Sequence, residues 1–414
     1  MVTQSETPDE NSDRTPMIGW LTVVLAFSLP LYRPWLGLAA TLVMLLWIFG
    51  GNLRSESKRL KNHRLTLAII VFLALNLLSL LWSSDPAAGL RYAAKYRYLL
   101  LVPMLATAVS EFFRKRAAAA LQIGAVGSVA LSVAVLLGAL HIGDAHPGDP
   151  SATMAHLDYT LILAVCSLLA LTRALYGTVS SSERVVWFAG SAVTAAALLF
   201  NIGRSGQLGF VVGLGVLLLR WSFDASLRIF AATIVLAVVG VIAVWVGAPP
   251  AVQRMDDARH ELHAAVVDHD YQSNIGGRLA ATVVAARIVR EHPLLGTGIG
   301  GNIPLFRQLL DTEFQDFKPA IYWYRHFHNQ YAQIASELGV AGLASLAWIF
   351  WVLVQGPYRS RGLAAAASVV ASVYLVAFLG EPFFHKQIPL IAFALVTGLI
   401  SGAQLDEKVD HTTQ

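Results

Sequence analysis

Charged residues and cysteine are scarce in this sequence. Only 14% of its 414 residues are Asp, Glu, Lys or Arg, whereas a soluble domain carries about 25%. The one cysteine, Cys166, excludes a disulfide framework. The sequence also has no Gly-x-Ser-x-Gly elbow, no HExxH zinc motif and no cysteine–histidine knuckle. It therefore differs from soluble hydrolases and metalloenzymes that depend on those motifs.

Long apolar runs are abundant instead. Hydrophobic residues make up 56% of the chain, and most runs are long enough to cross a hydrocarbon core of about 30 Å. The sequence predicts an all-α, polytopic membrane protein with about twelve transmembrane helices. The expected spans are residues 17–33, 34–50, 65–82, 97–112, 117–141, 157–175, 184–203, 205–221, 227–247, 328–355, 361–380 and 386–403.

Membrane orientation follows from Lys and Arg in short loops, which favour the cytoplasmic side. Five basic loops fall on one side when the N-terminus is cytoplasmic. They are residues 52–64, residues 112–117, and the loops containing Arg173 and Arg184, Arg220 and Arg228, and Arg359 and Arg361. Residues 1–16 are polar and mostly acidic, unlike the start of a signal peptide. We expect residues 1–16 and 404–414 to be cytoplasmic tails, the first of them disordered.

The largest stretch outside the apolar runs is residues 248–325. It separates the first nine spans, in residues 17–247, from the last three, in residues 326–403. Its segments "VQRMDDARHELHAAVV" and "GGRLAATVVAARIVREH" have the pattern of amphipathic helices. Pro293 and the glycines of "GTGIGG" end the second segment. We predict a small helical cap on the outer side, between the ninth and tenth spans.

The entrance to the tenth span is rich in ionisable side chains. The stretch "YRHFHNQYAQIASELGVAGL" begins at Tyr324 and contains Arg325, His326 and His328. Ionisable groups in or beside a span are costly and are functional by default. An interfacial histidine that is hydrogen-bonded to a neighbour is the alternative for His328.

The same stretch has two distinct faces if it continues as a helix. Asn329, Gln333 and Glu337 share one face, which points either to a wet cavity or to partner helices. Small residues occupy another face, as close packing of membrane helices requires. They are Ala332, Ala335, Gly339 and Gly342.

Two arginines stand out because glycines flank them. Arg204 lies in "FNIGRSGQLGF", between two apolar segments with almost no loop, and Arg278 lies in "NIGGRLAATVV". Glycine allows a bulky anion to approach the backbone, and the arginine fork binds phosphate through two hydrogen bonds. Snorkelling to lipid phosphates or a bond at a helix end is the alternative for each. Two arginines and His328 at one membrane face would suit a lipid-linked diphosphate.

Weaker candidates lie on the same outer side. "RYAAKYRY" places Arg91, Lys95 and Arg97 in an expected outer loop, against the orientation trend. They are candidates for further phosphate contacts, with snorkelling as the alternative. His156 and Asp158 open the sixth span, as pocket residues or as a polar helix start.

Two other patterns carry less weight. "HPLLGTGIGG" superficially resembles a phosphate loop, but it follows a helix and lacks the GK[ST] ending, so a tight turn that closes the cap is the better interpretation. His260, His263 and His269 lie among five acidic residues in a spacing that matches no known metal site, which favours a solvated helix face. We expect neither a metal nor a cofactor.

Several of these motifs together resemble the O-antigen ligase and O-antigen polymerase superfamily. They are "WSSDP" at 82–86, "NIGRSGQ", the large outer loop with "GGRL" and "HPLLGTGIG", and "HNQYAQIASELGVAGL" at the tenth span. The resemblance extends from about residue 80 to residue 400. The combination of PLLGTG, HNQ and a following glycine is fairly specific to the superfamily.

This resemblance implies a periplasmic reaction at the bacterial inner membrane. The donor would be a glycan on undecaprenyl diphosphate, and in the ligase the acceptor would be a sugar hydroxyl of lipid A–core oligosaccharide. By the resemblance, His328 is the essential histidine, and Arg204 and Arg278 are the essential arginines. His326 lies in the same motif, but the asparagine that follows, Asn329, favours His328.

Other functions stay open at this point. The motifs do not separate a ligase from a polymerase or from a protein O-oligosaccharyltransferase. A transporter would place charges near the bilayer midplane and show two similar halves, whereas these charges gather at one face. No nucleic-acid partner is expected, and neither the sugar nor the oligomeric state follows from the sequence.

Overall fold

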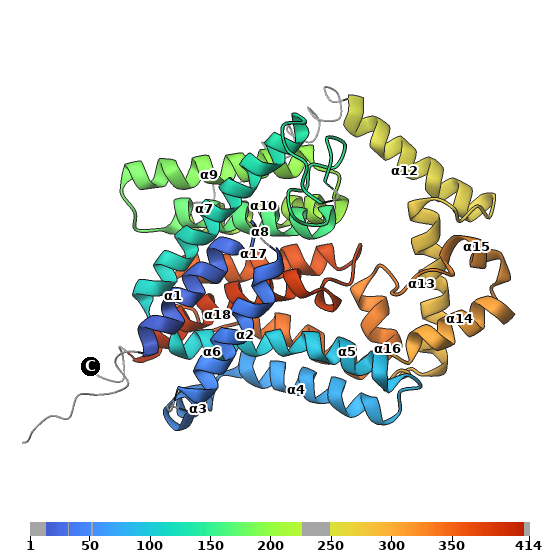
Figure 1. The fold of residues 1–414 in the computed structure, drawn as a ribbon, viewed down its shortest axis with the longest axis horizontal. Coiled ribbons are helices and arrows are strands. Elements are labelled where there is room, and N and C mark those ends of the chain that lie inside the picture. Colours follow the sequence, from blue (N-terminus) through green and yellow to red (C-terminus); the bar gives the residue numbers. More distant parts are fainter. Residues whose placement is uncertain (1–13, 32, 51–52, 144, 226–248, 410–414) are drawn as a thin grey trace, which may run out of the picture.

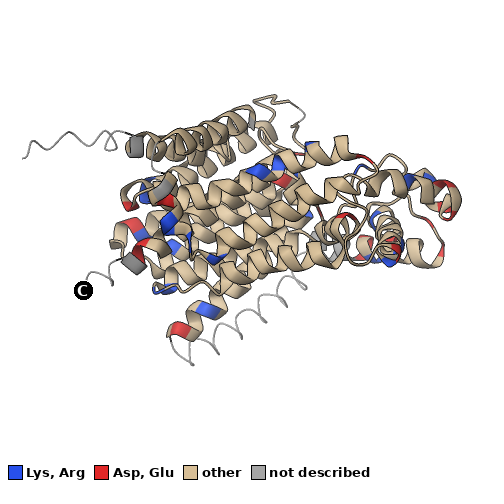
Figure 2. Cartoon of the chain, turned by 90° about the horizontal axis from the view of Figure 1, so that it is seen from below, with Lys and Arg blue, Asp and Glu red and all other residues tan. Residues whose placement is uncertain are grey.

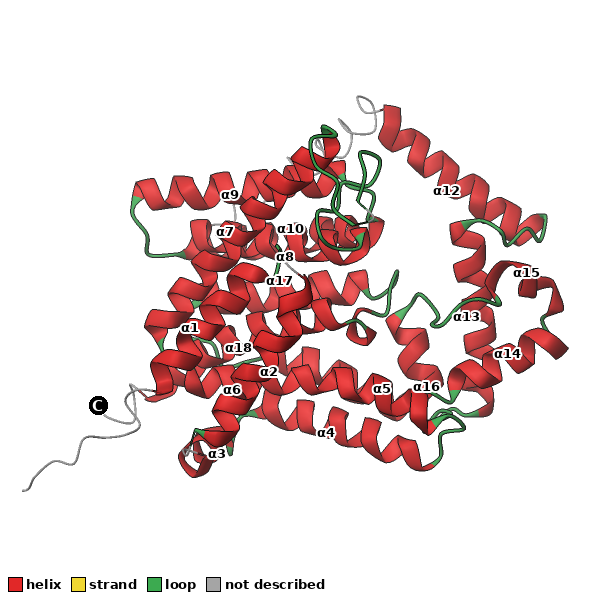
Figure 3. Cartoon of the chain, viewed as in Figure 1, coloured by secondary structure: helices red, strands yellow, loops and turns green. Residues whose placement is uncertain are grey.

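The fold is helical throughout the part of the chain that can be described. The computed structural model describes residues 14–409, apart from 32, 51–52, 144 and 226–248. Those residues form α-helices, short 3-10 turns and loops, and they contain no β-strand (Figure 3). The predicted all-α class is therefore confirmed. The ninth expected span, 227–247, and most of the expected tail 1–16 lie outside the described residues.

Seven of the described helices are long and apolar enough to cross a membrane. They are α4 with its 3-10 extension (Arg64–Leu81), α7 (Glu111–Leu136), α8 (His156–Tyr176), α9 (Ser181–Phe200), α10 (Arg204–Ala225), α16 (Gln330–Val354) and α18 (Gln387–Val409, apolar over Gln387–Glu407). Three shorter helices are also apolar, namely α1 (Arg14–Ser28), α2 (Arg33–Phe49) and α17 (Arg361–Ala377). The total of twelve spans stays a prediction.

The fourth expected span is where the structure differs most from the sequence prediction. Residues 97–112 do not form one helix, because the chain passes from α5 (Pro86–Tyr96) through a 3-10 turn (Arg97–Leu100) into the short α6 (Leu101–Ala108). The segment expected to be an outer loop is α5 itself. The side chain of Asp85 accepts a hydrogen bond from the backbone of Ala88, and Pro86 occupies the first turn. This cap and proline start a helix that composition alone had not indicated.

Four helices project beyond one end of the bundle (Figure 1), which we call the cap end. They are α12 (Pro249–Val267), α13 (Asn274–Glu291), α14 (Asn302–Thr312) and α15 (Lys318–Ile321). Apolar residues of α13, α14 and α15 pack around Phe306, Ile321 and Phe327 in a hydrophobic core separate from that of the bundle. Helices thus form where the cap was predicted, while its periplasmic location stays a prediction.

The opposite end of the bundle carries basic and acidic residues together, and Figure 2 shows that charged residues gather at both ends while the middle is mostly uncharged. Arg59, in α3 (Leu53–Leu60), and Arg114, in α7, both form salt bridges with the carboxylate of Asp406. These contacts join two of the predicted cytoplasmic loops to the end of α18. The last helix therefore extends to Val409, past the residue 403 at which we expected the C-terminal tail to begin.

Candidate active site

The candidate site lies where the cap meets α16. The tenth helix does not begin at His328 as expected, because Asn329 is its N-cap and α16 starts at Gln330. The Asn329 side chain accepts a hydrogen bond from the backbone of Ala332 and donates one to the Leu379 carbonyl. Asn329 thus fixes the backbone at the helix start. His328 has a φ of +51°, so it sits in a turn outside the helix.

A buried carboxylate, Glu381, holds His328 in place. His328 Nδ1 lies 2.9 Å from Glu381 Oε2 and is within hydrogen-bonding distance. Because a carboxylate can only accept, Nδ1 carries the proton and Nε2 of the neutral ring keeps its lone pair. The carboxylate is 2% exposed and the imidazole 22% exposed. His328 therefore has the arrangement of a general base that a carboxylate orients.

Glu381 is the centre of a wider charge network. Lys386 Nζ lies 3.1 Å from Glu381 Oε1 and also 3.1 Å from Asp158 Oδ1 in α8. His326 Nε2 lies 3.6 Å from Glu381 Oε1. Burial alone would raise the pKa of the Glu381 carboxyl, but the His328 hydrogen bond and the Lys386 charge hold it at about 2. Glu381 is thus an anion throughout the physiological pH range.

His326 is placed differently from His328. Burial lowers the pKa of His326 to about 4, against the opposing attraction of Glu381. Its Nδ1 accepts a hydrogen bond from the backbone N–H of His328, at 3.3 Å. The two rings are in edge contact, with centroids 4.2 Å apart. His326 is therefore a neutral neighbour, and its Nδ1 is already used within the loop.

Arg278 reaches the same loop from the cap. It lies in the second turn of α13, whose N-cap Ser273 accepts from the backbone of Gly276. A Cβ built on Gly380 would lie 3.4 Å from Arg278 Nη1 and 2.2 Å from Ser205 Oγ. Gly380 precedes Glu381 in the chain, so the guanidinium of Arg278 lies beside the loop that orients His328.

Arg204 lies near the same loop, at the start of α10. It is the first residue of α10, and its neighbour Ser205 packs against Gly380. Its side chain is exposed, whereas that of Arg278 is partly buried. Neither arginine has a salt-bridge partner among the residues that the structure describes. The structure therefore brings the three predicted residues, or their immediate chain neighbours, to one loop at the cap end.

Three of the weaker candidates from the sequence, Lys95, Arg97 and His156, bind other parts of the protein and not His328 or Glu381. Lys95 donates to the His385 carbonyl, and Arg97 donates to the Ala94 carbonyl and to the Tyr98 hydroxyl. His156 Nδ1 lies 3.0 Å from Asp149 Oδ2. These three side chains have protein partners that account for their positions. Arg91 and Arg325 are exposed.

The loop His292–Gly301 is a turn, as the sequence predicted, and it binds both sides of a break in α16. We call this loop the clasp. In α16 the helix is broken at Gly339, whose φ and ψ are 61° and −154°. The carbonyls of Ser336 and Glu337 accept from Thr297 and Gly298, and the amides of Val340 and Ala341 donate to Pro293 and Leu294. The loop thus replaces the hydrogen bonds that the broken helix loses.

The "WSSDP" segment holds this clasp from the other side. Trp82 Nε1 donates to the Leu295 carbonyl, Ser83 Oγ to the Ile299 carbonyl and Ser84 Oγ to the Gly301 carbonyl. Three motifs far apart in the sequence therefore form one structural unit. It connects the cap to α16.

The polar face of α16 points to partner helices. Gln330, Gln333 and Glu337 are fully buried. Gln333 donates to Glu337 Oε1, and Glu337 Oε2 lies 3.2 Å from His385 Nε2. The two atoms are close enough for an ion pair, but their orientation does not allow a hydrogen bond between them. We regard it as an electrostatic contact that lies behind the site.

His326, His328 and Glu381 are the group of described residues that could be considered for a metal, since their donor atoms lie within 4.8 Å of one another. Their hydrogen bonds do not fit one. The ammonium of Lys386 already pairs with Glu381, and a second cation there would be repelled. His326 Nδ1 accepts a hydrogen bond from the His328 backbone N–H, so the neutral ring carries its proton on Nε2, the nitrogen that faces Glu381. A protonated Nε2 cannot bind a metal ion. The residues present do not provide a ready metal site.

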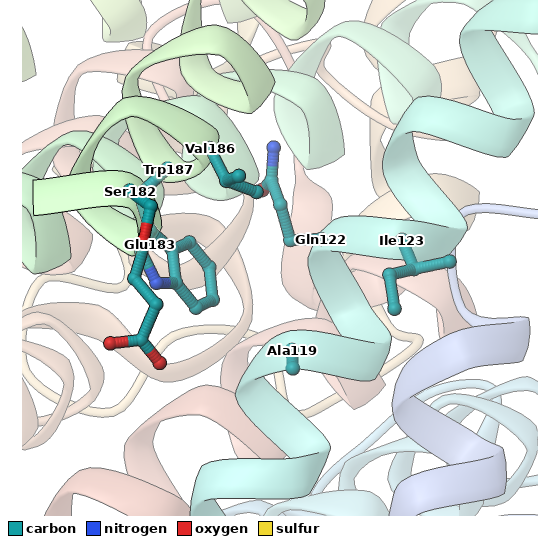
Figure 4. A pocket seen from close by; sticks show the side chains of 7 residues that line it. All are labelled: Ala119, Gln122, Ile123, Ser182, Glu183, Val186 and Trp187. Carbon is teal, nitrogen blue, oxygen red and sulfur yellow. The ribbon is translucent and has the colours of Figure 1, made fainter. Parts of the chain in front are cut away.

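A pocket elsewhere has no such chemistry (Figure 4). It lies between α7 and α9 and contains none of the site residues. Its acid, Glu183, forms the capping box of α9 with Ser180. The remaining lining is Ala119, Gln122, Ile123, Ser182, Val186 and Trp187.

Sequence reasoning missed Glu381 and Lys386. They lie in "GEPFFHK", within the break between the apolar helices α17 and α18, and an acid and a lysine at such a break are a signal of function. Nothing in their spacing links them to His328, which is more than fifty positions earlier. The contact depends on how α17 and α18 pack against α16.

Comparison with protein families identifies the part of the chain that contains the three predicted residues. Residues 189–347 match a family model described as O-antigen ligase. This range includes α10, the cap and the first part of α16, but not Glu381 or Lys386. No curated protein matches the chain. The match covers less than half of the chain and supports its membership in the O-antigen ligase superfamily of membrane glycosyltransferase-type enzymes.

Proposed function

We propose that the protein is an O-antigen ligase. It transfers a glycan en bloc from undecaprenyl diphosphate to a sugar hydroxyl of lipid A–core oligosaccharide, in lipopolysaccharide biosynthesis. The observation that carries this proposal is the His328–Glu381 pair, which lies beside Arg278 and the start of α10. An oriented base beside arginines that have no salt-bridge partner among the described residues suits the displacement of a diphosphate from a sugar.

The reaction is a single displacement at the anomeric carbon. The acceptor hydroxyl oxygen attacks this carbon, the bond from the carbon to the diphosphate oxygen breaks, and the configuration inverts. His328 Nε2 takes the hydroxyl proton, and Glu381 stabilises the imidazolium that forms. A positioned base commonly contributes roughly 10²- to 10⁴-fold in rate.

Arg278 and Arg204 hold the donor diphosphate and offset the charge that develops on it. Each preorganised group of this kind is worth about 3–4 kcal/mol. Diphosphate is a good leaving group, so the two arginines replace a metal ion. Transfer should therefore persist in EDTA. A loss of activity in EDTA that Mg²⁺ restores would contradict this part of the mechanism.

The polyprenyl chain of the donor lies in the bilayer, which places the diphosphate at the membrane interface. We propose the bacterial inner membrane as the location, with the cap and site in the periplasm and both termini in the cytoplasm. Arg59 and Arg114, in two of the predicted cytoplasmic loops, lie at the end opposite the cap, which supports this orientation. Arg91 and Arg325, which are exposed, are further candidates for contacts with substrate phosphates.

Transfer by purified protein tests the proposal. We expect glycan transfer from undecaprenyl diphosphate to lipid A–core with the wild type, and a loss of at least 100-fold with His328→Ala. Arg204→Lys and Arg278→Lys keep the charge but lose the planar fork, so a large loss would support binding of phosphate through two hydrogen bonds. Arg290→Lys, an exposed arginine on the same helix as Arg278, is the matched control and should retain activity.

The choice of acceptor separates the alternatives within the superfamily. Transfer to a second lipid-linked glycan and not to lipid A–core would identify a polymerase. Glycan attached to protein would identify a protein O-oligosaccharyltransferase. Full transfer by His328→Ala with a reduced flux of substrate across the membrane would favour a transporter and contradict the proposal.

A further inference from the structure

We propose that Lys386 and Asp158 are positioning residues that set the pH range in which His328 acts as a base. This inference rests on the proposed function for its meaning in catalysis. Lys386 holds Glu381 in the orientation that faces His328, and Asp158 holds Lys386. Neither residue touches the reacting atoms in this scheme, and both act through Glu381.

The geometry shows a chain of contacts from the core to the base. Asp158 lies in the first turn of α8. Lys386 directly precedes α18, and Glu381 lies earlier in the same connection between α17 and α18. The Lys386 ammonium is 3.1 Å from one oxygen of each carboxylate. The other oxygen of Glu381 receives Nδ1–H of His328. The two Glu381 oxygens thus have separate partners, and the carboxylate cannot rotate without breaking one of these bonds.

Lys386 is committed to protein partners, which distinguishes it from a substrate-binding cation. Its side chain is 25% exposed, and those of Asp158 and Glu381 are 10% and 2% exposed. Burial lowers the pKa of Lys386, but the charges of Asp158 and Glu381 raise it overall. Arg204 and Arg278 have no carboxylate partners among the described residues. The fork of an arginine is therefore available to an anion, whereas this ammonium is not.

Asp158, Glu381 and Lys386 together carry one excess negative charge. The carboxylates of Asp158 and Glu381 face one ammonium, that of Lys386, and the lowered pKa of His326 keeps the His326 ring neutral. An excess anion stabilises the imidazolium that forms when His328 takes a proton. Lys386 limits this stabilisation and Asp158 increases it. The two residues should therefore move the protonation of His328 in opposite directions.

Among the described residues, the charged and titratable groups around His328 enter this expectation. Tyr324, His326 and Glu381 contact His328. Lys386, Asp158, His385 and Arg278 act on these contacts from the neighbouring loops, α8 and α13. In Lys386→Met only a positive charge is removed, so the ring protonates at higher pH. In Asp158→Asn only a negative charge is removed, so it protonates at lower pH. Each shift should be about one pH unit.

The experiment measures this protonation without any substrate. Diethyl pyrocarbonate modifies a histidine in its neutral form and not in its protonated form, and peptide mass spectrometry resolves His328 from His326. We would record the pH midpoint of His328 modification in the wild type, Lys386→Met, Asp158→Asn and Lys386→Arg, each checked for folding by gel filtration and thermal unfolding. Lys318→Met is the matched control, because Lys318 forms a similar pair with Asp311, 2.7 Å away in the cap.

We expect an upward midpoint shift for Lys386→Met, a downward shift for Asp158→Asn, and little change for Lys386→Arg and Lys318→Met. The acid limb of the rate profile for transfer should move with the midpoints, while KM for the donor stays the same. Unchanged midpoints, or shifts in the same direction, would overturn the inference. So would a rise in donor KM for Lys386→Met at a fixed midpoint, because Lys386 would then bind substrate. A failure of the proposed function appears separately, as absent transfer by the wild type.

Discussion

At the scale of single residues, the chemistry depends on which nitrogen of His328 carries its proton. Glu381 accepts from Nδ1 and so leaves the lone pair on Nε2. Arg204, Arg278 and His328 could be chosen from the sequence because their side-chain types, flanking glycines and proximity to spans point to a phosphate site. Glu381 could not be chosen, because its role arises from a contact across 53 positions that no local pattern encodes.

Glu381→Gln should abolish most of the transfer activity while preserving the shape of the site. The Lys386 ammonium can only donate, so it selects the amide oxygen and turns the amide NH₂ toward His328 Nδ1. The ring then carries its proton on Nε2 and cannot accept one from the substrate. We expect kcat to fall by roughly 100-fold or more, with little change in donor KM. Steady-state kinetics beside the exposed control Glu313→Gln would reveal this, and unchanged kcat would contradict the assigned tautomer.

Acid should weaken the folded protein through His326 before it affects Glu381. The folded pKa of His326, about 4, lies below its ordinary value of 6.5. Between these pH values the unfolded chain binds more protons, so stability is complete above pH 6.5 and falls as the pH falls toward 4. Glu381 loses its contribution only at lower pH, between 4.5 and about 2.

Thermal unfolding in detergent from pH 7 to pH 5 checks the His326 effect. We expect the melting temperature to decrease over this range, and the decrease to be smaller in His326→Asn, which has no group that titrates there. An identical decrease in both proteins would show that His326 does not provide the pH dependence.

At the scale of elements, the unit that matters is the broken helix α16 with its clasp. The sequence correctly predicts an apolar helix here and a turn at "GTGIGG". The break at Gly339 is not predicted, because a glycine among small residues also fits ordinary close packing of membrane helices. Only the partner loop shows that this glycine has a backbone role, since Pro293 and Leu294 accept from the amides that follow it.

Gly339→Ala should destabilise the protein and displace the His328 turn. Its φ of 61° and ψ of −154° belong to a region that is essentially restricted to glycine, and a Cβ would lie 2.4 Å from the carbonyl carbon of Leu294. We expect a loss of about 2 kcal/mol or more in stability, seen as a lower melting temperature. Gly215→Ala, in α10, meets nothing within 4 Å and should be neutral or slightly stabilising. Equal effects of the two changes would contradict the clasp.

At the scale of the whole molecule, the charged residues gather at the two ends of an apolar bundle. Hydropathy predicts the helical membrane fold well, because a run of about twenty apolar residues has few alternatives in lipid. It fails at residues 86–108, where the Asp85 cap and Pro86 create α5 and a short α6 in place of a loop and one span. The preference of Lys and Arg for cytoplasmic loops predicts that the cap and the basic loops lie on opposite sides of the membrane.

Cysteine accessibility tests this orientation, and the composition makes the test simple. Cys166 is the one cysteine and is buried, so Cys166→Ala gives a silent background. A membrane-impermeant maleimide should label Asp316→Cys, in the cap, in intact spheroplasts. It should label Lys58→Cys, in α3, only after permeabilisation. The reverse pattern would place the candidate site in the cytoplasm and exclude the proposed reaction.

The convergence of Arg204, Arg278 and His328 on one diphosphate is the claim on which the whole account depends. A cryo-electron microscopy structure of the full chain with undecaprenyl diphosphate, in lipid nanodiscs, tests it most directly. We expect both phosphates between the guanidinium of Arg278 and the start of α10, with the sugar-bearing phosphate facing His328 Nε2. Phosphate density at Arg91 and Lys95 instead, with no contact to Arg278 or Arg204, would contradict the account.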